Sequence, residues 1–190
     1  AILHYLLAEE PAADATVKLE ILDAAGTVVR TYGRKKKDQA PPERRGPFSR
    51  DAGDGEDTNL VPAEKGANRF VWDLSYPPAE GFPGLIQWAG GLDGPTALPG
   101  TYTAKLTVGD QTAETRFEVV PDPRTSATAA DRQAQFEFVQ GIRKKLTETH
   151  RTIARLRSTR EQLEGLGEKI ADDEAGKALE KEAKDLAERL

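Results

Sequence analysis

A chain of 190 residues has room for one large domain or two small ones. Apolar residues make up 37% of it and charged residues 31%, so we expect a modest core together with an extended, solvated element. The formal net charge of −5 argues against a general nucleic-acid binder, which needs a basic surface. The absence of cysteine excludes disulfides, zinc–thiolate sites and thiol nucleophiles.

The ends of the chain are typical of a fragment. There is no methionine, and the sequence opens on Ala1 and closes on Leu190, so we expect it to come from a longer protein. No apolar run approaches the roughly 20 residues that span a bilayer, and no membrane span is predicted.

The first 32 residues predict three strands. Residues 2–7 form a short apolar run, and residues 17–22 alternate, with Val17, Leu19 and Ile21 on one face. A turn around Gly26 leads into a further β-prone stretch at 27–32, so the second and third strands should form a hairpin.

A long loop is predicted at 33–65, where prolines are frequent and large apolar residues are few. Its composition favours disorder or a loose surface excursion. The acidic stretch 51–58 does not have the ligand spacing of an EF-hand, and we interpret it as a flexible acidic loop. The basic run 34–37 is interpreted as solvated charge.

The central pattern of the chain is the alternation at 66–74. Phe70, Trp72 and Leu74 share one face, and because Trp72 is the largest of them, this should be the core face. A second pair of strands is predicted at 101–108 and 112–120, with Tyr102 and Ala104 on the core side. Six or seven short strands without a helical pattern indicate an antiparallel β-sandwich over residues 1–124.

The period changes after residue 125. Apolar residues recur at three- and four-residue steps, as in a coiled-coil seam. The seam runs through Val139, Ile142, Leu146, Thr149, Ile153, Leu156, Arg160 and Leu163. We predict helices at about 127–164 and 171–190, separated by a break at the glycines of 165–167 and folded back as a long hairpin over 125–190. The fold class is therefore α+β, mainly β, and the helical hairpin could support a homo-oligomer.

The loop at 76–95 holds the candidate contact residues Tyr76, Phe82 and Trp88. Exposed aromatic rings on the edge of a sandwich are one way in which carbohydrate-binding modules stack on sugars. The alternative, which we favour, is that these rings cover the edge of the sandwich or an adjacent domain, because large apolar side chains are costly to leave in water.

Catalytic and metal-ligating patterns are lacking in the sequence. The two histidines, His4 and His150, lie far apart in sequence and have no neighbouring serine, so neither is predicted to be catalytic. We predict no metal, no cofactor and no enzymatic activity for this fragment.

Several segments carry a resemblance to known proteins. The stretches 19–30, 68–74 and 98–103 resemble the immunoglobulin-like domain of the flagellar hook-capping family. With Val-Val-Pro-Asp-Pro-Arg at 119–124 and the helical tail, they are more similar to the C-terminal region of exported bacterial BNR-repeat, sortilin-like β-propeller proteins, often labelled glycosyl hydrolases.

The resemblance implies an immunoglobulin-like sandwich, export to the periplasm or the extracellular space, and an upstream propeller domain in the same chain. It implies that any glycosidase site lies on that propeller, because no catalytic residue of the family maps onto this sequence. The expected function is therefore a non-catalytic accessory domain that packs against, spaces or oligomerises the parent protein, and saccharide binding is the alternative.

Overall fold

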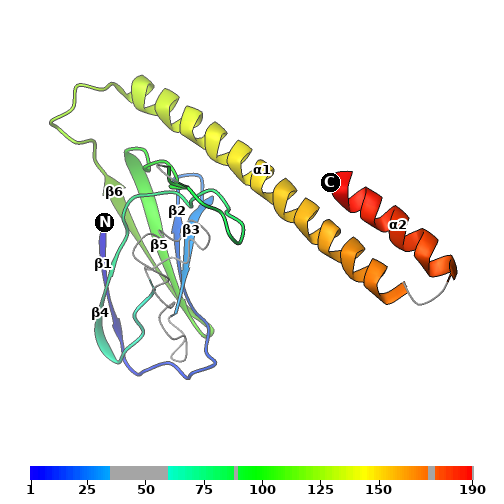
Figure 1. Ribbon diagram of the computed structural model, residues 1–190. Helices are drawn as coiled ribbons and strands as arrows, with labels where there is room; N and C mark the ends of the chain where they lie inside the picture. The colour runs from blue at the N-terminus through cyan, green and yellow to red at the C-terminus, as the bar shows by residue number, and fades with distance from the viewer. Residues whose placement is uncertain (35–59, 88–89, 171–173, 190) are drawn as a thin grey trace.

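The computed structural model describes residues 1–34, 60–87, 90–170 and 174–189. Within these residues the chain forms six β-strands followed by two α-helices. Figure 1 shows the strands gathered into one body and the long helix crossing one end of that body and extending away from it. The predicted mixture of sheet and helix, with the helices last in the chain, is confirmed.

The strands form two antiparallel sheets. A two-stranded sheet pairs β1 (Ile2–Leu7) with β4 (Gly66–Val71). A four-stranded sheet has the order β3-β2-β5-β6, with β2 at Val17–Leu22 and β3 at Val28–Gly33. Its other two strands are β5 (Gly100–Val108) and β6 (Gln111–Val119). The predicted pairing of neighbouring strands in hairpins is confirmed for β2 with β3 and for β5 with β6.

Side chains from both sheets form one buried cluster. Trp72 is 1% exposed and makes edge-to-face contacts with Tyr102 and Phe117, at 5.3 and 6.0 Å between ring centroids. The inward residues of β2 are all buried, as their alternation predicted: Val17, Leu19 and Ile21. Burial of such side chains is the main stabilising contribution to this part of the fold.

The strand predicted at 66–74 ends earlier than expected. β4 stops at Val71 because the next residues form a turn: the Asp73 carboxylate accepts a hydrogen bond from the Ser75 amide at 3.0 Å, and Leu74 has a φ of 62°. Trp72 nevertheless stays inside the core, and its indole Nε1 donates to the Ser75 carbonyl oxygen at 3.3 Å.

The two ends of the predicted 33–65 loop are held in place. A parallel bridge joins Arg34 to Val61, and Val61 is 1% exposed. The Arg34 guanidinium donates to the carbonyl oxygens of Pro11 and Ala12, so the first residue of the basic run 34–37 serves the fold. The predictions for 35–59, including the acidic stretch 51–58, lie outside the described residues.

The helical part differs from the prediction in one respect. Helix α1 spans Ala129–Ile170, so the break predicted at Gly165-Leu166-Gly167 is wrong; two glycines at the end of a long helix cost stability but do not exclude helical backbone. Helix α2 is short, Glu174–Arg189, and runs back beside α1, where its Ala183 and Ala187 are buried. Neither helix has, in its described part, the length and apolar character needed to cross a membrane.

Candidate interaction surface

The loop that follows Trp72 is held in shape by its own backbone. The amides of Tyr76 and Ala79 donate to the carbonyl oxygens of Pro95 and Leu92, and Ala97 donates to Leu74. Gly94 lies so close to the opposite arm that a Cβ on it would overlap the carbonyl oxygens of Tyr76 and Pro77. The two arms therefore approach each other more closely than any residue with a side chain at position 94 would allow.

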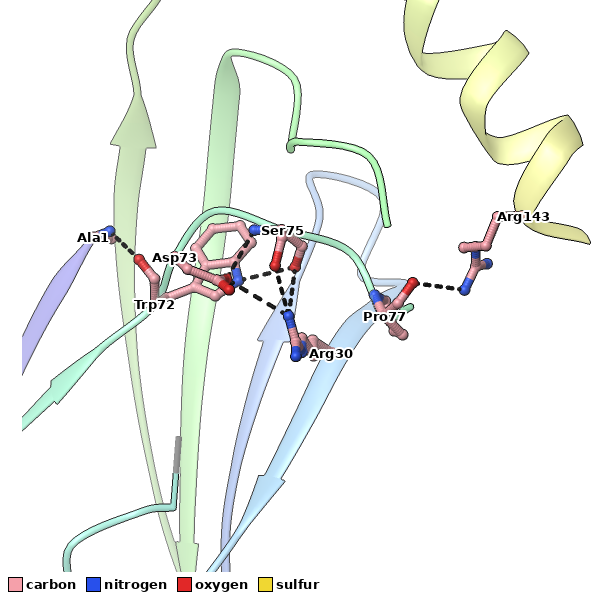
Figure 2. A network of polar contacts seen from close by, with 7 residues as sticks. All are labelled: Ala1, Arg30, Trp72, Asp73, Ser75, Pro77 and Arg143. Atoms are coloured by element: carbon pink, nitrogen blue, oxygen red, sulfur yellow. Dashed lines mark hydrogen bonds and ion pairs between the residues drawn. The ribbon is translucent and has the colours of Figure 1, made fainter. Parts of the chain in front are cut away.

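A polar network fixes the start of this loop (Figure 2). The Arg30 Nη1 donates to the Ser75 hydroxyl at 2.6 Å and lies 3.6 Å from the Asp73 carboxylate. Burial by itself would raise the pKa of Asp73, but hydrogen bonds from Ser75 and the charge of Arg30 together leave that pKa below its ordinary value. On the other side of the turn, the Ala1 amine donates to the Trp72 carbonyl oxygen at 2.6 Å, so the network joins β1, β3 and the loop.

Helix α1 holds Glu80 by both its backbone and its side chain. The Glu80 amide donates to the Thr147 hydroxyl at 3.1 Å. The Glu80 carbonyl oxygen lies 2.6 Å from Nδ1 of His150, and because a carbonyl only accepts, Nδ1 must carry the proton. The Glu80 carboxylate pairs with the Arg151 guanidinium through two hydrogen bonds, one of them 2.6 Å from Nε to Oε2. This bidentate pairing lowers the pKa of Glu80 and raises that of Arg151.

Two further arginines of α1 bond to backbone carbonyls of the loop. Arg143 donates to Pro77 at 3.1 Å, as Figure 2 shows, and Arg157 donates to Pro83 at 3.2 Å. The contacts therefore extend over about four turns of the helix and bind a stretch of loop that has no secondary structure of its own. These bonds satisfy carbonyl groups that would otherwise be left to water, and they set where the helix crosses the sheets.

The aromatic residues of the loop complete the contact. The Phe82 ring is 7% exposed, because the His150 ring packs against it edge-on at 5.3 Å and the Arg157 guanidinium covers it at 4.6 Å. Tyr76 packs edge-on against Phe136, with ring centroids 4.9 Å apart. A cation over an aromatic face and two edge-on ring pairs are each favourable by roughly 0.5–1.5 kcal/mol beyond burial.

The structure thus places two of the three sequence-predicted contact residues, Tyr76 and Phe82, between the loop and α1. Trp88 lies outside the described residues. In this arrangement the Phe82 ring is not available as a platform for a sugar. Of the two histidines, His150 is buried in the contact and His4 is exposed on β1, and the described contacts do not bring them together.

Comparison of the chain with family models, curated proteins and solved structures found no match.

The other side of α1 carries an open apolar groove of about 480 Å³. Phe138 is 70% exposed there, and Ile142 is 46% exposed. The groove is lined by Glu137, Phe138, Gly141, Ile142, Lys145, Leu146 and Thr149. Thr147, which binds the loop, follows Phe138 by two and a half helical turns, so the groove and the loop contact lie on opposite sides of α1. We call this feature the α1 groove.

No cluster of residues suited to hold a metal ion occurs in the part of the chain that the structure describes.

Sequence reasoning missed the residues that dock α1, namely Arg143, Thr147, His150, Arg151 and Arg157. A signal was present in the spacing of the first four, since steps of three and four residues from Arg143 put polar groups on a second face of the helix, beside the apolar seam. Without the fold, that face is indistinguishable from a solvated one.

Proposed function

We propose that this chain is a non-catalytic accessory domain of a larger exported β-propeller protein and that it serves in packing, spacing or oligomerisation. In this proposal the two sheets form an immunoglobulin-like sandwich and the two helices form a helical hairpin. Export and the propeller partner rest on the resemblance of the motifs at 68–74, 98–103 and 119–124. Any glycosidase activity of the parent would belong to the propeller.

The observation that carries the proposal is that one side of α1 is bound to the loop whereas the opposite side is exposed and apolar. One side is fixed to the loop by five polar and aromatic side chains. The other side presents Phe138 and Ile142 to solvent along the α1 groove. A rigidly mounted helix with an unpartnered apolar face is typical of an interaction module, because exposed apolar patches on soluble proteins mark contacts with other molecules.

The proposal is tested by light scattering coupled to size-exclusion chromatography, on this chain alone and mixed with the upstream region of its parent protein. We expect a complex with that region, with a second copy, or with both. A monomer that binds neither would contradict the proposal. A saccharide panel read by tryptophan fluorescence belongs in the same experiment, and saturable binding there would favour the sugar-binding alternative, which requires α1 to move away from Phe82.

A further inference from the structure

The α1 groove has the form of a socket for a helix. Phe138, Gly141, Ile142 and Lys145 stand at positions i, i+3, i+4 and i+7 of α1, the four residues that make a hole in knobs-into-holes packing. A Cβ built on Gly141 meets nothing within 4 Å, so the hole is open at its centre. A large apolar side chain on a neighbouring helix would fill it, and Phe138 is itself such a side chain.

We propose that the α1 groove binds α1 of a second copy of this chain, running antiparallel, with Phe138 of each copy seated over Gly141 of the other. This inference rests on the proposed function, because it names the partner of the same surface. The two-fold axis would pass near residue 140, which sets Phe138 opposite Ile142 of the second copy.

The length of the uncovered part of α1 fits this arrangement. At 1.5 Å per residue α1 is about 63 Å long, whereas α2 is about 24 Å long and can cover less than half of it. Figure 1 shows the end of α2 beside the middle of α1. An antiparallel partner centred on residue 140 would pair residues 129–151 of the two copies, so the partner's helix would begin opposite residue 151, just before the stretch of α1 beside which α2 ends.

The charges beside the groove favour the antiparallel orientation. In an antiparallel pair of helices, residues on the same flank of each helix face one another. With the axis near residue 140, the exposed Glu137 therefore lies beside the exposed Lys144 of the second copy, twice per dimer. A parallel pair in register would instead bring Lys145 against Lys145 in the middle of the contact, which is unfavourable.

The docked side of α1 leaves room for the second copy. The loop and the sheets lie on the side of Arg143 and Thr147, facing away from the groove. We call the part of the chain that holds the six strands, β1 to β6, the β-body. In the two-fold pair the two β-bodies would lie on the outside, and the two α1 helices would form the centre.

The test uses the full chain, with sedimentation or light scattering over a wide range of protein concentration, because the state of a dimer depends on concentration. We expect a concentration-dependent dimer for the unsubstituted chain and a monomer for Phe138→Glu. Val120→Glu is the matched control, since Val120 is 69% exposed and lies outside α1, and this variant should dimerise like the unsubstituted chain. Circular dichroism verifies that each variant is folded.

Gly141→Ala separates the proposal from a loss of folding. Alanine is the better helix former and nothing in the monomer obstructs its methyl group, so the helix should become more stable. The same methyl group would occupy the site of the partner's Phe138, and we expect the dissociation constant of the dimer to rise at least about tenfold. A more stable helix with unchanged dimerisation would overturn the proposed seat of Phe138.

A charge exchange tests the orientation. Glu137→Lys and Lys144→Glu should each weaken the dimer severalfold, and the double variant should recover most of the loss. Failure of the double variant to recover would overturn the antiparallel register. A chain that stays monomeric at every concentration, or a dimer that survives Phe138→Glu, would overturn the inference. If a monomeric chain still binds the upstream region of the longer protein, the proposed function stands although the dimer does not form.

Discussion

Glu80 shows how much of the molecule's architecture depends on one loop residue. Its amide, carbonyl and carboxylate each have a partner on α1, and the three partners come from the five-residue stretch 147–151. Such a residue ties an irregular loop to a regular element, and its removal should change the position of α1 more than the stability of the sheets.

The first prediction concerns the acid sensitivity of that contact. The pKa of Glu80 in the folded chain is lowered from its ordinary value of 4.5, so the carboxylate stabilises the folded contact at pH values above 4.5. This stabilisation is lost as the pH falls through the lowered pKa, when the carboxylate takes up a proton. It should be small, because the pair is exposed and screened by salt.

The measurement is the hydrogen-exchange protection of the Glu80 amide across the acid range. In the unsubstituted chain the protection of the Glu80 amide should decrease as the pH is lowered. In Glu80→Gln the protection should be lower throughout and insensitive to pH over the same range. Equal pH profiles for the two proteins would contradict the role given to the carboxylate.

The second prediction concerns Gly94. A methyl group at this position would overlap the carbonyl oxygens of Tyr76 and Pro77, which are backbone atoms that can move only if the loop opens. We expect Gly94→Ala to lower the free energy of unfolding by about 2 kcal/mol or more, measured by urea denaturation. Gly90→Ala is the control in the same loop, because its nearest neighbour would be 3.9 Å away, and it should be nearly neutral.

At the scale of elements, the position of α1 depends on the loop and not on direct packing of the helix on a strand. The contacts from α1 that fix it against the β-body reach residues 76–83, which have no regular structure. Phe82 is central to them, because its ring is enclosed by His150 and Arg157.

The third prediction is that Phe82→Ala releases α1 from the loop. Truncating a buried phenylalanine costs about 3–5 kcal/mol in a rigid core, and less where the site can open, so we expect the lower end of this range. The loss should appear as faster hydrogen exchange in the middle of α1, while the amides of β2 and β5 stay protected. Ile86→Ala, in the same loop but 75% exposed, should leave exchange in both regions unchanged.

At the scale of the whole molecule, the buried apolar cluster belongs almost entirely to the two sheets and the segments next to them. The helices add buried contacts of their own, such as Ala183 and Ala187, and the contact at Phe82. The apolar core therefore lies in the β-body, and we expect the β-body to fold without the helices.

The fourth prediction follows from this division. A chain ending at residue 128 should keep its β-sheet circular dichroism and the emission of a buried Trp72, because the partners of Trp72 are Tyr102 and Phe117. It should also expose Phe82 and bind more of a hydrophobic dye than the full chain. Loss of cooperative unfolding in the truncated chain would show instead that the helices complete the core.

The sequence by itself determined the elements whose pattern is local. Alternation gave the buried faces of β2 and β5, the size of Trp72 gave the core, and the three- and four-residue period gave two helices. It misjudged the ends of elements, because the local free-energy difference between continuing and ending a strand or helix is small. Asp73 and Leu74 turn the chain after β4, and α1 continues through its glycines to Ile170.

Only the tertiary structure decided what the loop and the polar face of α1 do. The sequence favoured packing for Tyr76 and Phe82 but left a ligand-facing role open, and Thr147, His150 and Arg151 could have been solvated, because such side chains combine an apolar body with a polar end. The choice is made by contacts between residues about 70 positions apart, such as Glu80 with His150 and Arg151. The spacing along α1 places these polar residues on one face, but nothing in the sequence identifies the loop as the partner of that face. These contacts also decide which side of α1 is occupied by the chain itself and which side is left for a partner.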